Sequence, residues 1–109
     1  MESQNPKEFF EKTLPNRFKP DKADGIDVVT QINVTGIEGS SWTVKIKDKK
    51  LSATEGTDPS ATLTLKMNEK DFLDLVNGKI SAEKAFFTGK IQFKGDIRLA
   101  LKLRDAGFL

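Results

Sequence analysis

Apolar residues alternate with polar ones along five separate segments of the chain, which is the pattern of half-buried β-strands. The second segment shows it clearly, because Trp42, Val44 and Ile46 alternate with serine, threonine and lysine. Turn-forming residues at 36–39 and 48–50 separate the first three segments, which predicts antiparallel hairpins there. The predicted strands cover residues 26–35, 41–47, 51–55, 61–67 and 90–94.

A helical period with capping residues predicts helices in the remaining segments. Near the start, Asn5 is a good N-cap and apolar residues recur four apart up to Phe18, but Pro15 should interrupt the helix. We therefore predict a short helix or a broken pair. Further helices should begin after Asn68, Ser81 and Asp96. The order of elements predicts an α+β fold, with a mostly antiparallel five-stranded sheet and helices on one face.

The last predicted helix is more apolar than a two-layer domain of this size requires. At about 100° per residue, Arg98, Lys102 and Asp105 occupy one polar sector of roughly 60°. Such a helix could be wedged between the sheet and the N-terminal segment, lie in a dimer contact, or wall a cavity that holds an apolar ligand. Its apolar residues are Ile97, Leu99, Ala100, Leu101, Leu103, Ala106, Phe108 and Leu109.

Composition favours a single domain over residues 1–109, and it argues against catalysis. The chain of 109 residues has a 37% hydrophobic content, and it contains no Cys, His or Tyr. Disulfides, thiolate nucleophiles, zinc sites of the usual kind and the commonest general base are therefore excluded. We expect no catalytic residues, no metal site and no cofactor. The N-terminus lacks the features of a secretory signal and the apolar runs are short, which predicts a cytoplasmic protein without a membrane span.

Positive charge is concentrated at the C-terminal end. From Lys79 onward there are seven basic and three acidic residues, a net +4 in a chain whose total is +2. Such an end could attract an anionic membrane surface or the phosphates of coenzyme A, although ordinary solvated lysines are the simpler explanation. The lysine cluster at 47–50 fits a hairpin turn and lacks interleaved aromatic residues, so we expect no nucleic-acid partner.

The segment 61–103 closely resembles the second half of the sterol-carrier-protein-2 domain family. The resemblance rests on an ordered combination of motifs. These are a helix start with Asp71, Phe72 and Leu73, a Gly78-Lys79 turn, an Ala-Phe-Phe-x-Gly-Lys segment at 85–90, and a Gly-Asp-led final helix with Leu-Ala-Leu-Lys-Leu at 99–103. The strand and turn at 42–48 agree as well, so the resemblance covers nearly the whole chain.

The resemblance implies a twisted sheet covered by helices that enclose an apolar tunnel. In this family the tunnel accepts sterols, fatty acids, fatty acyl-CoA or phospholipids, and no catalytic residues are implied. Carried over by position, the lipid-binding residues would be Val44, Ile46, Leu65, Phe72, Leu75, Val76, Ile80, Phe86, Phe87, Ile97, Leu101, Leu103 and Phe108.

Two features of this chain bear on the implied function. It stops at 106–109 without the peroxisomal address that eukaryotic carriers often have, so we do not expect peroxisomal import. The short tail also leaves Phe108 or a partner subunit to close the tunnel mouth, in a monomer or a weak homodimer. The alternative is a non-catalytic interaction or dimerisation module of the same fold, whose apolar face meets a protein partner.

Overall fold

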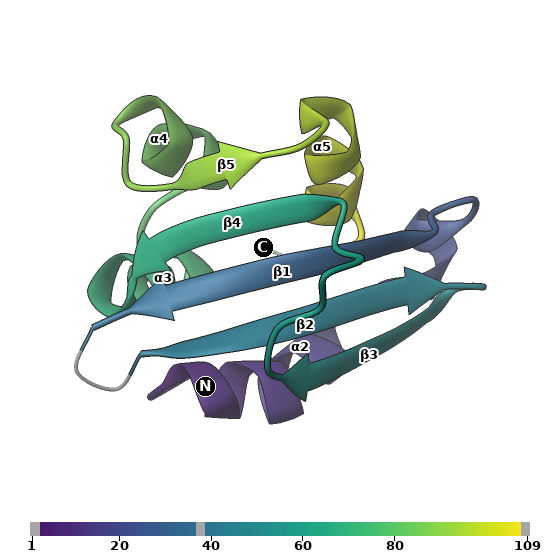
Figure 1. Ribbon diagram of the computed structural model, residues 1–109, viewed down its shortest axis with the longest axis horizontal. Coiled ribbons are helices and arrows are strands. Elements are labelled where there is room, and N and C mark those ends of the chain that lie inside the picture. The colour runs from purple at the N-terminus through teal and green to yellow at the C-terminus, as the bar shows by residue number, and fades with distance from the viewer. Residues whose placement is uncertain (1–2, 37–38, 108–109) are drawn as a thin grey trace.

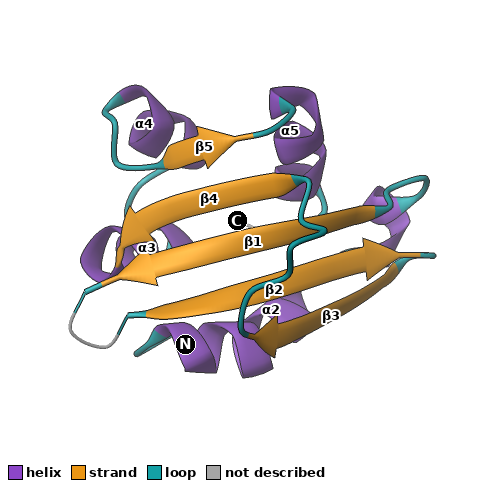
Figure 2. Cartoon of the chain, viewed as in Figure 1, coloured by secondary structure: helices purple, strands orange, loops and turns teal. Residues whose placement is uncertain are grey.

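The computed structural model describes residues 3–36 and 39–107, which form a five-stranded sheet with helices on one of its faces (Figures 1 and 2). The strands are β1 Val28–Thr35, β2 Ser40–Lys47, β3 Lys50–Glu55, β4 Leu63–Asn68 and β5 Gln92–Lys94. The helical elements are α1 Pro6–Glu8, η1 Phe9–Thr13, α2 Leu14–Arg17, η2 Pro20–Ala23, α3 Glu69–Val76, α4 Ala82–Phe87 and α5 Ile97–Asp105.

The sheet is mixed, with the strand order β3-β2-β1-β4-β5. Three of its pairings are antiparallel, whereas β1 and β4 run parallel, with Thr30 opposite Leu63 and Ile32 opposite Leu65. The predicted α+β class and mostly antiparallel sheet are confirmed. The parallel pair was not predicted, because alternation gives the faces of a strand but not its neighbour.

The first helical segment runs without a break from Pro6 to Arg17, contrary to the interruption expected at Pro15. Its middle, η1, is a π-helical turn in which the Leu14 N–H donates to the Phe9 carbonyl. A proline inside an α-helix lacks the N–H for the i−4 bond, and its ring clashes with that carbonyl. The wider turn changes the spacing of the carbonyls just before Pro15, which lets the chain continue as a helix.

Four aromatic rings fill the space between this segment and the sheet. Phe10 stacks on Trp42 at 4.9 Å and on Phe72 at 5.4 Å between ring centroids. Phe9 meets Phe10 and Phe72 edge-on, at 5.2 and 5.5 Å. All four rings are almost fully buried. Figure 1 shows the N-terminal helix beside β2 and β3, so this half of the covered face is packed solid.

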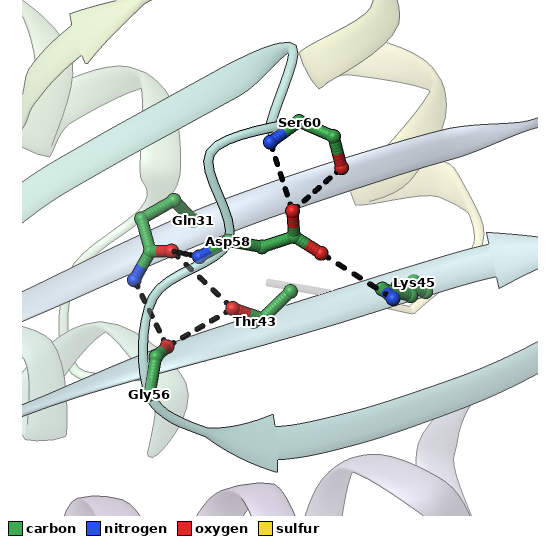
Figure 3. A network of polar contacts seen from close by, with 6 residues as sticks. All are labelled: Gln31, Thr43, Lys45, Gly56, Asp58 and Ser60. Carbon is green, nitrogen blue, oxygen red and sulfur yellow. Dashed lines mark hydrogen bonds and ion pairs between the residues drawn. The ribbon is translucent and has the colours of Figure 1, made fainter.

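The loop from β3 to β4 crosses the opposite, open face of the sheet (Figure 1). Gln31 of β1 fastens it there, because its side-chain oxygen accepts from the Asp58 N–H at 3.0 Å and its amide nitrogen donates to the Gly56 carbonyl at 3.3 Å. The Thr43 hydroxyl also reaches the Gly56 carbonyl, at 3.0 Å. This network lets a short loop connect two strands that run in the same direction (Figure 3).

Asp58 fixes the outer part of the same loop. Its carboxylate accepts from the Ser60 N–H and hydroxyl at 2.8 and 2.6 Å, and it lies 3.3 Å from the Lys45 ammonium. The bonds from Ser60, and then the charge of Lys45, hold the pKa of Asp58 below its usual range. Asp58 therefore stays ionised to a lower pH than an unperturbed aspartate does.

We expect Gln31→Ala to lower the free energy of unfolding by about 2 kcal/mol, because the Asp58 N–H and the Gly56 carbonyl lose a partner. Urea unfolding measures the change. Gln92→Ala is the matched control, since this glutamine is exposed on β5 and its loss should change stability by less than about 0.5 kcal/mol. Equal effects from the two substitutions would contradict the role given to Gln31.

Candidate functional site

A cavity of about 290 Å³ lies between the β4–β5 half of the sheet and the helices α4 and α5. The N-terminal helix does not reach this half, and α4 and α5 stand beside β5 instead (Figure 1). The lining of the cavity is almost entirely apolar. The lining residues are Thr30, Leu63, Leu65, Ile91 and Phe93 from the sheet side, Ala82, Glu83, Phe86 and Phe87 from α4, and Ile97, Ala100, Leu101, Leu103 and Arg104 from α5.

The cavity has a buried floor and an exposed rim. On the floor, Thr30 and Leu63 are each 1% exposed and Leu103 is 3% exposed. At the rim, Phe87 is 83% and Leu101 is 44% exposed. Large apolar side chains are normally buried, so these rim residues leave an apolar opening between α4 and α5.

A close backbone approach places α5 against the sheet. Gly95 precedes α5 with φ +131°, and a Cβ there would come within 2.7 Å of the Thr62 carbonyl oxygen. Asp96 then caps α5 by accepting from the Arg98 N–H at 2.9 Å, and the bonds from Arg98 lower the pKa of Asp96. At the other end, the Lys19 N–H donates to the Ala106 carbonyl at 2.8 Å. Both ends of α5 are therefore held.

An ion pair joins α4 to α5 at the rim. Arg104 Nη1 contacts Glu83 Oε1, and Arg104 Nη2 lies 3.5 Å from Asp105 Oδ1. Glu83 and Arg104 are the charged residues among the described residues that line the cavity. Both side chains are partly exposed, so the pair contributes little stability in water and can exchange partners.

One polar atom on the floor has no partner. Within residues 3–36 and 39–107, Thr30 Oγ1 is the buried side-chain nitrogen or oxygen without a hydrogen bond. Thr30 faces the same side of β1 as Ile32 and Val34, among the apolar side chains of Leu63 and Leu65. A buried hydroxyl in such surroundings is unfavourable unless something else supplies its partner.

The structure brings together six of the thirteen residues predicted to bind lipid. These six, which line the cavity, are Leu65, Phe86, Phe87, Ile97, Leu101 and Leu103. Six others lie in or against the packed core, away from the cavity, and these are Val44, Ile46, Phe72, Leu75, Val76 and Ile80. Their half of the sheet is occupied by Phe9 and Phe10. Phe108 lies outside the described residues, and a lipid contact for any of the thirteen stays a prediction.

Sequence reasoning missed several lining residues. Alternation along β1 and β4 already placed Thr30 and Leu63 on the covered face, but only the parallel pairing shows that they are neighbours. Nothing in the sequence indicated that Glu83 and Arg104 line a cavity, because their pairing depends on how α4 and α5 are placed relative to each other. The missed residues are Thr30, Leu63, Ala82, Glu83, Ile91, Phe93, Ala100 and Arg104.

Neither a metal centre nor a membrane span is found in the described part of the chain. No group of three or more His, Cys, Asp or Glu residues there is placed to hold a metal ion. No helix among the same residues has the length and apolar character needed to cross a bilayer.

Residues 8–106 match the model of the SCP-2 sterol transfer family. The chain belongs to this family. The match covers nearly the whole chain, so the family resemblance noted in the sequence is confirmed.

Relatives of this chain include longer proteins. Human sterol carrier protein 2 is 37% identical over 70 residues, which are 64% of this chain but 13% of that protein. Hydroxysteroid dehydrogenase-like protein 2 of Danio rerio is 30% identical over 92 residues, 84% of this chain and 22% of that protein. The chain therefore spans only about an eighth of the length of the sterol carrier protein 2 that it matches.

A solved structure of similar size shares the fold over most of both chains. Palmitated SCP2L2 from Aedes aegypti superposes with a TM-score of 0.73 at 27% identity, covering 90% of this chain and 90% of that one. The SCP2-like α+β arrangement is thus shown for the described residues.

We expect Gly95→Ala to lower the free energy of unfolding by about 3 kcal/mol, because a Cβ at this φ would meet the Thr62 carbonyl and Leu63 at the start of β4. Gly89→Ala is the matched control, since Gly89 also has a positive φ but has open space around it, and should cost about 1 kcal/mol. Thermal unfolding of both variants measures the difference. Identical losses would show that no close approach constrains α5.

Proposed function

We propose that this member of the SCP-2 sterol transfer family is a non-catalytic carrier that holds a single-chain lipid in the cavity between α4, α5 and the sheet. The observation that supports this most strongly is an apolar cavity of about 290 Å³ whose rim is open and apolar. Similarity to a palmitated relative agrees with an acyl chain as the guest. A lipid in this cavity would cover the apolar side chains of α5 that line it.

The size of the cavity favours an acyl chain over larger lipids. A dry apolar cavity of about 150 Å³ admits benzene, which has six carbon atoms. At about 290 Å³, the cavity has roughly twice that volume, enough for about a dozen carbons by the same proportion. One acyl chain fits this size, whereas a two-chain phospholipid exceeds it and would have to remain largely outside.

The energetics suit reversible carriage. Burying about twelve methylenes contributes about 10 kcal/mol relative to water, against an association cost of at least about 4 kcal/mol. A bilayer offers the same chain a similarly apolar environment. The protein therefore competes with water easily and with membranes nearly evenly, as a carrier that both loads and releases lipid requires.

The first test is whether the purified protein contains or binds lipid. Native mass spectrometry should detect co-purified acyl chains, and a fluorescent fatty acid should bind with saturation at one site. Finding neither would count decisively against the carrier.

We expect Ala100→Trp to weaken fluorescent fatty-acid binding by at least tenfold, because the indole would fill the cavity from the α5 wall. Thr54→Trp is the matched control, since Thr54 is exposed on β3 away from the cavity, and its binding should equal the wild type. Far-UV circular dichroism verifies the fold of both. Undiminished binding by folded Ala100→Trp would place the lipid elsewhere.

We propose further that the rim docks on an anionic membrane surface during loading. Exposed Phe87 and Leu101 offer an apolar tip, and the exposed lysines Lys84 and Lys102 come from the same two helices. Apolar insertion combined with basic residues near the headgroups is the usual combination for interfacial binding.

Reversing both lysines, in Lys84→Glu/Lys102→Glu, should weaken co-sedimentation with vesicles that contain anionic lipid by at least tenfold, since each base contributes about 1 kcal/mol near such a surface. The control is Lys66→Glu, which changes an exposed lysine on the open face of the sheet. Transfer of a fluorescent fatty acid from these vesicles should slow in parallel. Equal losses in the control would indicate a general charge effect.

The alternative function is an interaction or dimerisation module, which the same exposed rim favours. Phe86, Phe87, Ile97 and Leu101 are all more than 40% exposed, and a protein partner would cover them as well as a membrane does. Light scattering after size-exclusion chromatography, together with a lipid assay, distinguishes the interaction module from the lipid carrier. A stable dimer without bound lipid would favour the module, and a monomer with lipid would favour the carrier.

A further inference from the structure

Among the described residues, Thr30 provides the polar side chain on the floor of the cavity, and its environment differs from that of Thr43, the other buried threonine of the central strands. Thr43 is 4% exposed and its hydroxyl reaches Gln31 Oε1 at 3.3 Å and the Gly56 carbonyl at 3.0 Å. Thr30 is 1% exposed and, within the described residues, its hydroxyl has no partner. The Thr43 hydroxyl therefore contributes hydrogen bonds to the fold, whereas the Thr30 hydroxyl contributes none within the described residues.

The unpaired hydroxyl belongs to a residue that lines the space the lipid would occupy, where the oxygen itself is still covered by neighbouring atoms. Thr30 lines the cavity together with Leu63, which lies opposite it on β4. A valine of nearly the same shape would fill this place without leaving a donor unsatisfied. A hydrogen-bonding atom of the guest is therefore the partner that this position lacks.

The atom that meets Thr30 must be neutral. The described floor residues provide no charge to balance a carboxylate, and burying an unpaired one costs several kcal/mol. The cationic group of the lining is Arg104, which lies at the rim beside Glu83. A charged headgroup is thus stable only near the rim, while the buried end of the chain faces a lone hydroxyl.

We propose that Thr30 Oγ1 hydrogen-bonds a neutral oxygen, a hydroxyl or carbonyl, at the buried end of a single-chain lipid whose charged headgroup remains at the rim. This inference rests on the carrier function proposed above and makes it more specific. The preferred guest is an acyl chain that is oxygenated far from its headgroup, and Thr30 is the residue that distinguishes it from a chain ending in a methyl group.

The test is a double-mutant cycle between Thr30 and the end of the chain. Affinities of 10-hydroxydecanoic, 12-hydroxydodecanoic and 16-hydroxyhexadecanoic acid are measured by displacement of a fluorescent fatty acid, each beside the fatty acid of equal length. At the chain length whose terminal hydroxyl reaches Thr30, Thr30→Val should weaken binding of the hydroxy acid roughly fivefold more than binding of the fatty acid of equal length. Thr30→Ser, which keeps the hydroxyl, should retain the wild-type difference.

The stability of the ligand-free protein provides an independent readout. Thr30→Val should raise the melting temperature by a few degrees, because it removes an unpaired buried hydroxyl. Thr43→Val should lower it, because that hydroxyl is bonded. A drop in both variants would mean that Thr30 has a partner within the protein, which would overturn the proposal.

The outcomes separate this inference from the function on which it rests. Binding of both kinds of acid to the wild type, with no difference caused by Thr30→Val at any of the three lengths, would overturn the role of Thr30 and leave the carrier intact. Failure of every acid to bind the wild type would overturn the carrier, and the inference with it.

Discussion

The stack of Phe10 against Trp42 and Phe72 determines how the helices share the sheet. Because these rings fill the space over β2 and β1, they fix the N-terminal helix and Phe72 of α3 there. The rings beside β5, Phe86, Phe87 and Phe93, meet edge-on and are not fully buried. The other half is left to α4, with six residues, and α5, with nine. Two short helices held apart leave a space that their side chains do not fill. The aromatic stack therefore accounts both for the solid core on one half of the sheet and for the cavity on the other.

The elements could be predicted from the sequence because their signals are local. Ser81 and Asp96 cap α4 and α5 as their residue types suggest, and the period-two pattern located every strand. The cavity could not be predicted in the same way. Whether Phe72 or Phe86 faces a hollow depends on which helix covers which half of the sheet, and that follows from the aromatic stack and the parallel pairing of β1 with β4, both of which join residues far apart in sequence. The family resemblance implied a lined tunnel and therefore assigned lining roles to residues of both halves.

The way α4 and α5 are held accounts for a cavity that can open. Strong constraints act at the ends of α5, through Gly95 and Ala106, whereas the link between the two helices at the rim is the partly exposed pair of Glu83 and Arg104. Exposed ion pairs are weak in water, so separating the helices costs little compared with disturbing the stacked core. Opening at this rim would therefore cost little and would leave the sheet and its crossing loop unchanged.

The polar groups at the rim of the cavity differ from the polar group at its floor. An entirely apolar pocket would accept an acyl chain at any depth, because every methylene contributes the same free energy. Among the described residues, the paired Arg104 and Glu83 lie at the rim and the Thr30 hydroxyl lies at the floor, so the two ends of a guest would not be equivalent. The charge prefers the end near water, where its desolvation is small, and the hydroxyl prefers a neutral oxygen. In the proposed carrier, affinity would therefore come from the apolar wall, while orientation and selectivity would come from Thr30 at the floor and the paired Arg104 and Glu83 at the rim.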